Sequence, residues 1–292
     1  MEVHLVDGTY ELFRHHFAVP SHITAEGVEV AATRAVLASM LRMLEDGVTH
    51  IGIATDKVVE SFRNEMFAGY KTGEGVPPDL FAQFPLMEAV LEAAGFKVFA
   101  MVEFEADDAL ASASSLAMTD PRVEKVFICS PDKDLAQCVT PNNQIVQLDR
   151  RRGLIYDWEG VVEKFGVSPK AIPDWLALVG DTADGIPGLP GWGAKSSSTV
   201  LSYYGHLEDI PASAEDWKIP VRNSTKLAST FNEYRKEVFL YRDLTTLDFS
   251  IPVIKNIDEL LWTGPCDHVS DICKHLDASR LVEKVFELSD RC

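Results

Sequence analysis

The sequence has no apolar run long enough to cross a bilayer, and none of its 292 residues belongs to an evident export signal. Its first residues, Met1 to Asp7, form a strand-like pattern and not a basic segment followed by an apolar one. Both absences argue against a membrane or secreted protein. We therefore expect a cytoplasmic one.

Paired cysteines and zinc-type histidines are also missing. The five cysteines are irregularly spaced, form no C-x-x-C pair and are odd in number, which favours reduced thiols over a disulfide framework. The eight histidines show no H-E-x-x-H spacing, which argues against a zinc site.

Basic residues are scarce. The chain has 27 lysines and arginines against 45 acids, a formal net charge of −18, so a broad basic surface for nucleic acid is not expected. Apolar residues make up 46% of the chain, enough for the core of one large domain or two modest ones. No internal repeat or low-complexity stretch is evident.

Short apolar runs alternate with helical patterns through the first 150 residues. Strands are expected over residues 3–6, 51–55, 97–101, 126–129 and 144–148, and helices from residue 10 and over 31–44. This alternation predicts an α/β fold, with a mostly parallel central sheet and helices on both faces. Ligands of such sheets bind beyond the carboxyl ends of the strands.

Acidic residues follow four of these strands. They are Asp7, Asp56, the group Glu105, Asp107 and Asp108, and the pair Asp132 and Asp134. Any one of them could be a helix N-cap, which is a common role for acids after strands. Three carboxylates within four positions repel each other unless cations or solvent compensate. Acids at four strand ends therefore favour a cation site at one edge of the sheet.

A second acidic pair lies in a region of different character. An expected helix over residues 173–179 ends at Gly180 and is followed by Asp181 and Asp184. A glycine-rich turn comes next, with Gly191, Gly193, Lys195 and Ser196 at the start of another helix. Such a turn can present backbone N–H groups to an anion, although an ordinary connection between two helices has the same sequence pattern. Scattered basic residues in the helical pattern over 220–248, Arg222 among them, fit a solvated face.

Together and in this order, the motifs resemble one family. They are Leu5-Val-Asp7-Gly8, Asp56, Ser61-Phe-Arg63, Gly69-Tyr-Lys71, Glu105-Ala-Asp-Asp108, Asp132-Lys-Asp134, Gly180-Asp181 with Asp184, and Gly191-x-Gly193 with Lys195. The chain is similar to the 5′-to-3′ exonucleases and flap endonucleases, above all to the exonuclease domain at the N-terminus of bacterial DNA polymerase I. The resemblance covers nearly the whole chain. Because no polymerase segment follows, we expect a stand-alone nuclease.

The resemblance implies a domain arrangement. A resolvase-like (PIN-type) nuclease core would span residues 1–172, with a helical arch over about 62–95 that admits single-stranded flaps. A helix-hairpin-helix DNA-binding domain would span 173–250, and a helical tail over 251–292 would pack back on the core. Relatives usually carry a basic residue where this arch has Glu74, which puts strong phosphate binding at the arch in doubt.

The resemblance also implies two-metal hydrolysis of DNA phosphodiester bonds. Two Mg²⁺ ions, with Mn²⁺ as a substitute, would bind nine carboxylates: Asp7, Asp56, Glu105, Asp107, Asp108, Asp132, Asp134, Asp181 and Asp184. Two such ions about 4 Å apart can activate a water and neutralise the attacking and leaving oxygens. Arg14 and Lys71 would contact the scissile phosphate, so the expected catalytic residues are these two with Asp7, Asp107 and Asp132.

The expected substrate is DNA with 5′ flaps, nicks or duplex ends. Contacts would come from Arg63, Tyr70, Lys71, Gly191, Gly193, Lys195 and Ser196, with a K⁺ ion at the hairpin. Tyr70 could stack on a terminal base or only pack under its loop. The protein would act as a monomer alongside a separate DNA polymerase and a ligase. Two alternatives stay open: a non-catalytic relative that binds branched DNA, and a PIN-type ribonuclease.

Overall fold

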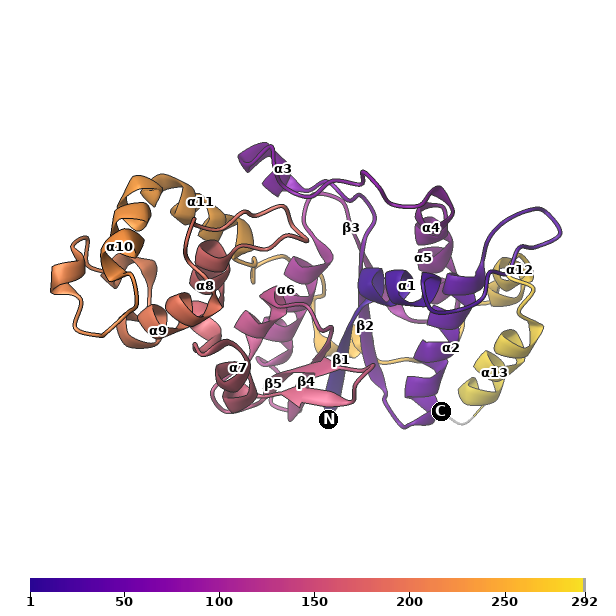
Figure 1. Cartoon of the computed structure of the whole chain (residues 1–292). Helices are drawn as coiled ribbons and strands as arrows, with labels where there is room; N and C mark the ends of the chain where they lie inside the picture. Colours follow the sequence, from indigo (N-terminus) through magenta and orange to yellow (C-terminus); the bar gives the residue numbers. More distant parts are fainter. Residues whose placement is uncertain (291–292) are drawn as a thin grey trace. The chain divides into compact units, whose positions relative to one another are not determined.

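The computed structural model describes residues 1–290 and divides into two compact units (Figure 1). Unit 1 consists of Met1–Ser61, Gly73–Ser130 and Asp248–Cys292, of which residues up to 290 are described. Unit 2 consists of Phe62–Thr72 and Pro131–Leu247. Each unit is therefore built from segments that are distant in sequence.

Four parallel strands form the centre of unit 1. They are β1 (Glu2–Asp7), β2 (His50–Asp56), β3 (Lys97–Met101) and β4 (Lys125–Cys129). β1 lies between β2 and β4, and β3 pairs with the other edge of β2. The two central strands, β1 and β2, are buried along almost their whole length, as expected for strands covered on both faces. The order of the strands reverses between β1 and β4, which makes their carboxyl ends a switch point where ligands commonly bind.

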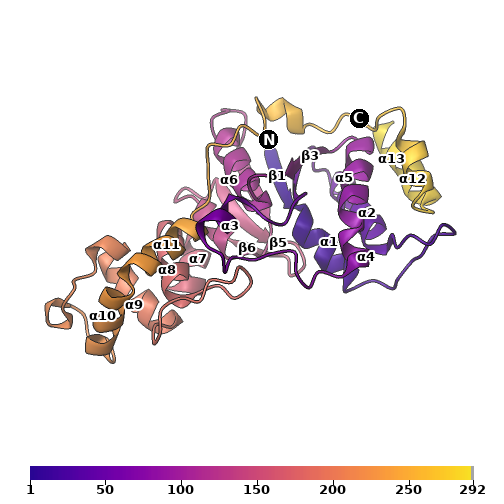
Figure 2. The same cartoon turned by 90° about the horizontal axis from the view of Figure 1, so that it is seen from above.

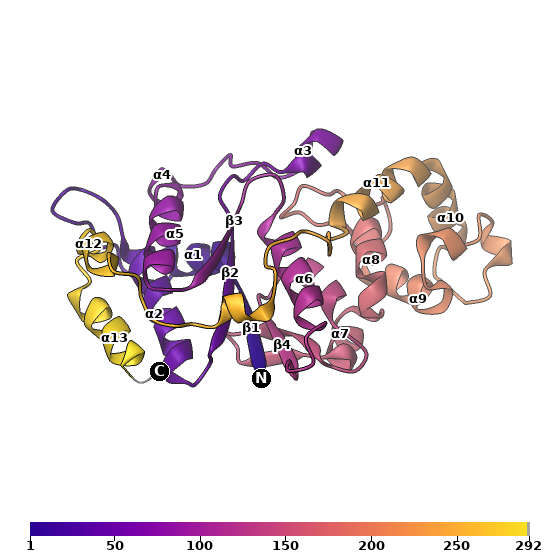
Figure 3. The ribbon, with the colours of Figure 1, turned by 180° about the vertical axis from the view of Figure 1, so that it is seen from behind.

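Helices cover both faces of this sheet. They are α1 (Gly8–His16), α2 (Ala31–Glu45), α4 (Pro78–Phe81), α5 (Gln83–Ala93) and α6 (Ala106–Ala117). α6 lies on one face, while α1, α2 and α5 lie on the other (Figures 1 and 3). Leu37, Met40 and Leu41 of α2 are completely buried, so its apolar stripe faces the core.

The end of the chain packs onto unit 1. An extended segment leads past η5 (Ile257–Leu260) to α12 (Val269–Lys274) and α13 (Ser279–Ser289), which lie outside α5 and α2 (Figure 3). The backbone N–H of Trp262 donates to the Thr49 carbonyl at 2.9 Å, and its indole Nε1–H donates to the Ala94 carbonyl at 2.8 Å. Trp262 is 5% exposed and so anchors the segment.

Unit 2 is mainly helical (Figure 2). Its elements are α3 (Phe62–Met66), η1 (Asp134–Cys138), β5 (Ile145–Asp149), β6 (Leu154–Tyr156), α7 (Trp158–Phe165), η2 (Pro169–Ala171), α8 (Ile172–Val179), α9 (Ala194–Tyr204), η3 (Leu207–Asp209), η4 (Ala214–Asp216), α10 (Ser224–Glu233) and α11 (Arg235–Thr245). α8 packs against α9 and α11, and one apolar cluster runs through these helices. Trp192 lies in this cluster, with its ring 6.1 Å from that of Phe231.

The predicted fold class is confirmed: the sheet core is mostly parallel with helices on both faces, and a helical region follows. One strand pair differs from expectation, because β5 and β6 form an antiparallel hairpin and the sequence indicated only the first of them. β6 has three residues, none of them buried, too few for an alternating pattern to be visible. The proposed domain boundaries and the helical arch stay predictions. Within residues 1–290, no helix combines the length and the apolar character needed to cross a membrane.

Candidate functional site

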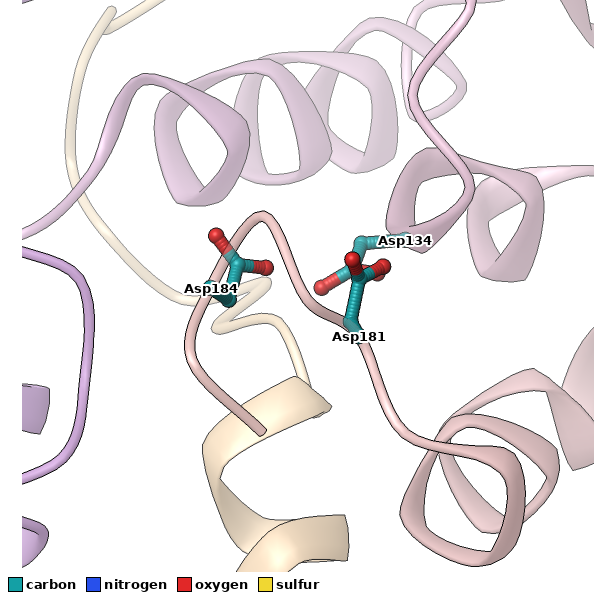
Figure 4. A group of neighbouring side chains, drawn as sticks. All are labelled: Asp134, Asp181 and Asp184. Carbon is teal, nitrogen blue, oxygen red and sulfur yellow. The ribbon is translucent and has the colours of Figure 1, made fainter. Parts of the chain in front are cut away.

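Three carboxylates converge in unit 2 (Figure 4). Asp134 begins η1, whereas Asp181 and Asp184 belong to the loop that follows α8. One oxygen from each lies within 4.8 Å of the other two. The loop is closed by paired backbone hydrogen bonds between Asp181 and Ile186, at 2.9 and 2.8 Å, which fix the acids that it carries. This cluster is the natural candidate for a metal centre.

Asp134 is the member of the cluster whose carboxylate has an oxygen without a hydrogen-bond partner among the described residues. It is 6% exposed, and its Oδ1 finds no hydrogen-bond partner within the described residues. Burial raises its pKa well above the usual value, and the neighbouring carboxylates of Asp132, Asp184 and Asp181 raise it further. A buried, unpaired carboxylate oxygen is costly unless a cation binds it.

Two lysines compensate the cluster. The ammonium of Lys71 lies 3.0 Å from Oδ1 of Asp184, and the ammonium of Lys133 pairs with Asp181. The backbone N–H of Lys71 also donates to the Asp184 carbonyl at 3.0 Å, so this lysine is held by its main chain as well. Both ammonium groups therefore lie beside the carboxylates that would bind a divalent ion.

Asp132, two residues before Asp134 in the sequence, contacts Asp134 of the cluster. Its Oδ1 accepts the backbone N–H of Asp134 at 3.1 Å, and its carbonyl accepts a hydrogen bond from Gln147. Asp132 is exposed, unlike Asp134 and Asp181. Its carboxylate therefore keeps access to solvent.

The remaining predicted ligands lie in unit 1 at the carboxyl ends of the strands. Asp7 ends β1 and Asp56 ends β2, and the register pairs Asp7 with Ala54, two residues before Asp56. Asp7 is also the N-cap of α1, since its Oδ1 accepts the Tyr10 N–H at 2.8 Å. Its Oδ2 accepts the Ser130 hydroxyl at 2.8 Å. Asp7 can therefore cap α1 and also belong to the expected metal site.

The acids at the start of α6 divide into two kinds. Asp108 is completely buried, and its oxygens accept the backbone N–H of Glu105 at 3.1 Å and that of Asp248 at 2.9 Å. The first bond is half of a capping box and the second tethers the last segment of the chain, so Asp108 has a structural role, and its expected role as a metal ligand stays a prediction. Asp107 is half-buried. Glu105 is 5% exposed and accepts the Ser61 hydroxyl at 2.6 Å.

Arg14 is paired within its own helix. Its Nη2 lies 2.5 Å from Oε2 of Glu11, which is 1% exposed, and 2.9 Å from Nε2 of His15. The guanidinium is therefore held in one orientation on α1. Its predicted contact with the scissile phosphate stays a prediction.

Arg63 and Tyr70, which were expected to contact DNA, are both buried, and that contact stays a prediction. Arg63 is 1% exposed, and its guanidinium donates to the carbonyls of Leu244 at 2.7 Å and Thr246 at 3.1 Å, at the C-terminus of α11. That end carries unsatisfied carbonyls, which explains the arginine. Tyr70 is 4% exposed within the apolar cluster of unit 2, which matches the packing alternative. Base stacking would require its ring to leave that cluster.

The hairpin over residues 188–198 has the expected exposed turn. Gly191 has a φ of +85°, and no described atom lies within 4 Å of a Cβ built on Gly191 or Gly193. Gly193 is the extended N-cap of α9, and Ser196 Oγ accepts its backbone N–H at 3.0 Å. The side chain of Lys195 is exposed.

Sequence reasoning missed several residues of the site, among them Glu11, Ser61, Ser130 and Lys133. Lys133 lies between two predicted ligands, and this adjacency could have singled it out. Ser61 opens one of the family motifs, but only the tertiary structure brings it to Glu105, just as it brings Ser130 to Asp7.

The donor set suits a hard divalent cation. The cluster of Asp134, Asp181 and Asp184 offers only carboxylate oxygens, and it contains the unpaired oxygen of Asp134. Mg²⁺, Mn²⁺ and Ca²⁺ prefer such ligands, whereas zinc usually takes histidine or cysteine. The residues therefore fit a hard divalent cation, the class of metal that the sequence implied.

Known proteins match both parts of the chain. Residues 2–166 match the family described as the 5′-3′ exonuclease N-terminal resolvase-like domain, and residues 167–268 match the family described as the 5′-3′ exonuclease C-terminal SAM fold. A 5′-3′ exonuclease of Aquifex aeolicus is 31% identical over 252 residues, which cover 83% of this chain and 82% of that protein. DNA polymerase I of Bacillus caldotenax is 30% identical over 289 residues, 96% of this chain.

The chain spans about a third of the length of the DNA polymerase I relatives, 32% for the Bacillus caldotenax protein. Among solved structures, a bacteriophage T5 flap endonuclease in a pseudo-enzyme-product complex with DNA and metal ions is 18% identical with a TM-score of 0.63. That match covers 99% of this chain and 98% of the phage protein, and it shows a common fold. With both family matches in sequence order along its length, the chain belongs to the 5′-3′ exonuclease family.

Proposed function

We propose that the protein is a metal-dependent nuclease that removes nucleotides from 5′ ends and cleaves 5′ flaps of DNA by hydrolysis of phosphodiester bonds. The observation that carries the proposal is the carboxylate cluster of Asp134, Asp181 and Asp184, with one buried oxygen that lacks a partner among the described residues. Family membership gives this cluster its chemical context, because the related T5 enzyme was solved with DNA and metal ions.

The cofactor in this proposal is Mg²⁺, two ions per chain, with Mn²⁺ as a substitute. Asp134, Asp181 and Asp184 would hold one ion, assisted by Asp132. The acids of unit 1, namely Asp7, Asp56, Glu105 and Asp107, are the remaining members of the ligand set. When bound, such ions supply the Lewis acidity that phosphodiester hydrolysis needs.

Two cationic side chains would bind the phosphate in this proposal. Lys71 is fixed beside Asp184 through both its backbone and its ammonium, so its charge can meet the negative charge that develops on the phosphate without reorganisation. Arg14 is held on α1 by Glu11 and would act in the same way. Neither residue needs to remove a proton.

The hairpin over 188–198 would hold duplex DNA. The N–H groups at the start of α9, the charge of Lys195 and the hydroxyl of Ser196 are suited to backbone phosphate, and the open space around Gly191 and Gly193 allows close approach. A K⁺ ion at this hairpin is part of the proposal. If it is present, replacing KCl by LiCl at equal ionic strength weakens duplex binding.

The decisive experiment digests matched substrates with Mg²⁺ and with EDTA. The substrates are a 5′ flap, a nick, a blunt duplex, a single strand and an RNA–DNA hybrid, each labelled at the 5′ end. We expect Mg²⁺-dependent release of short products from the flap and the nick. Binding without release would favour the non-catalytic alternative, and release from RNA alone would favour the ribonuclease.

The cellular context is proposed on the same basis. A nuclease acting on flaps and nicks would work in the cytoplasm as a monomer, beside a DNA polymerase that creates the flap and a ligase that seals the nick. Size-exclusion chromatography with light scattering tests the monomer. A joint assay with polymerase and ligase on a gapped duplex tests the order of steps.

A further inference from the structure

A pocket of about 330 Å³ lies in unit 2 beside the hairpin over 188–198. One wall is the hairpin and the first turns of α9, including Gly191, Lys195 and Ser196. The other wall is the segment before α10, including Arg222 and Asn223. Sequence reasoning placed that second segment in the expected DNA-binding domain but named no DNA contact in it.

Charge is distributed unusually in this pocket. The whole chain carries 45 acids against 27 lysines and arginines, yet none of the described residues lining the pocket is acidic. Lys195 and Arg222 are both exposed, and neither forms an ion pair with a described residue. The other cations near functional residues, Lys71, Lys133 and Arg14, are all paired with acids. Two uncompensated cations on facing walls favour an anion between them.

The two walls are held in a fixed relation. The indole Nε1–H of Trp192, between the two glycines of the hairpin, donates to the carbonyl of Leu227 in α10 at 3.2 Å. Trp192 is 6% exposed and packs against Trp217 and Phe231. The hairpin and α10 are therefore joined through a packed aromatic cluster, so little loop ordering is needed when a ligand binds.

The backbone at both walls favours the same ligand. α9 and α10 both begin at the pocket, so the positive ends of two helix dipoles face it. Asn223, the N-cap of α10, has a φ of +60° and makes no capping hydrogen bond with its side chain. The N–H of Ser224 donates to the Val221 carbonyl at 3.2 Å, and the N-cap side chain does not satisfy the N–H groups that follow it in the first turn, which can therefore take an external acceptor.

We propose that Arg222 binds the same DNA backbone phosphate as Lys195, so that the turn before α10 and the glycine hairpin together form one phosphate clamp. The inference rests on the proposed function, and it extends the duplex contact to a residue that the sequence assigned to a solvated face. Contacts of this kind fix the position of the duplex and carry no base specificity.

The experiment measures binding of a nicked duplex in Ca²⁺ across a series of KCl concentrations. The variants are Arg222→Ala, Lys195→Ala, the double variant, and Lys226→Ala as a matched control, because Lys226 is an exposed cation of α10 that does not line the pocket. Arg222→Ala should lower the affinity and reduce the log–log salt slope by part of the roughly 0.9 that one neutralised phosphate contributes, because Lys195 still contacts the shared phosphate; the double variant should lose the full amount. Lys226→Ala should leave the slope unchanged.

Coupling between the two cations is the sharper readout. If they share one phosphate, the fold-decrease in affinity of the double variant differs from the product of the two single decreases, whereas two independent contacts would multiply. Arg222→Lys should retain most of the slope. Thermal melts should be the same for all variants, since these side chains are exposed.

Equal slopes for Arg222→Ala and Lys226→Ala would overturn the clamp. So would single decreases that multiply in the double variant, because the two cations would then act separately. Failure of the wild-type protein to cleave flaps in Mg²⁺, with an intact salt effect at Arg222, would instead contradict the proposed function. The two failures are therefore distinguishable.

Discussion

Asp107 and Asp108 are sequence neighbours with opposite environments, although their residue type gives no hint of it. Asp108 is completely buried and accepts two backbone N–H groups, whereas Asp107 is half-buried. Acids at the start of a helix can be caps or metal ligands, and only the fold shows which of them is buried. Because Asp107 and Asp108 are neighbours in sequence, substitutions at the two positions form a matched pair of variants.

Asp107→Ala should abolish cleavage, by at least roughly 100-fold, which exceeds what outer-shell changes usually cost. The melting temperature in EDTA should not fall, because one of several crowded carboxylates is removed. Asp108→Ala should instead lower the free energy of unfolding by on the order of 1–3 kcal/mol, because it leaves buried N–H groups unpaired. Melting curves in EDTA and cleavage rates in Mg²⁺ check both. Equal melting temperatures for the two variants would contradict the division of roles.

Gly191 and Gly193 should respond differently to alanine. Gly191 has a φ of +85°, so Gly191→Ala should cost about 1–2 kcal/mol of stability. Gly193 has a φ of −138° and a ψ of 173°, which any residue adopts, so we expect Gly193→Ala to leave stability unchanged. A drop in DNA affinity for Gly193→Ala without a change in melting temperature would show close approach of the ligand. Unchanged affinity would mean that this glycine does not contact DNA.

Sequence reasoning placed acids at the ends of the strands but could not separate expected ligands from residues with a structural role. Asp7 and Asp56 could be placed at one edge of the sheet, because the carboxyl ends of parallel strands share an edge. Arg63 could not be assigned, because its partners are carbonyls about 180 residues away in sequence. Tyr70 was left undecided for the same reason. Burial depends on contacts that no local pattern encodes.

At the scale of elements, the segment around Lys71 is fixed by the loop after α8. A Cβ at Gly185 would lie 2.1 Å from the Gly69 carbonyl oxygen, so the two segments touch through their backbones. The loop and the lysine therefore form one element of the site. The close approach explains the glycine at position 185, where a Cβ has no room.

Lys71→Ala should reduce the single-turnover cleavage rate by about 100- to 1,000-fold, the usual effect of removing one electrostatic contact to the transition state. Duplex affinity in Ca²⁺ should change by less than about threefold, and the melting temperature only slightly, since a partly exposed ion pair contributes up to about 1 kcal/mol. Lys133→Ala is the control, because Lys133 pairs with Asp181 and has no expected phosphate contact. Reduced affinity with an unchanged rate in the bound complex would make Lys71 a docking residue.

Asp174 of α8 is a buried acid that joins helices away from the carboxylate cluster. It is 2% exposed, and His206 Nδ1 lies 2.7 Å from its Oδ2. Burial raises its pKa above the usual value, although His206 and Arg242 partly oppose this. Its stabilising contribution is therefore complete below the pKa of the unfolded chain and is lost as the pH rises through the folded pKa.

Asp174→Asn should accordingly gain stability relative to the wild type as the pH rises from about 4 to about 7, the range above the ordinary pKa of an aspartate. Thermal melts in EDTA across that range check the difference. Asp209→Asn, at an exposed acid in η3, is the control and should show no trend. A difference that shrinks with rising pH would mean that the His206 and Arg242 contacts outweigh burial.

The whole molecule is acidic, with a formal charge of −18, so a nuclease of the proposed function would hold DNA through a few local contacts. Each phosphate contact adds roughly 0.9 to the log–log salt slope, so two to four contacts predict a slope of about −2 to −4 for a nicked duplex in Ca²⁺. Lys195→Ala should weaken flap and blunt duplexes alike. A slope steeper than about −6 would require a broad basic surface.

The interleaved course of the chain has a consequence for biosynthesis. Trp262 closes unit 1 by donating to the carbonyls of Thr49 and Ala94, more than 160 residues earlier. At about 5–20 residues per second, a ribosome needs roughly 10–40 s to make the stretch between Thr49 and Trp262. Through that interval, the parts of β2, α2 and α5 that the last segment covers in the folded protein have no partner from that segment.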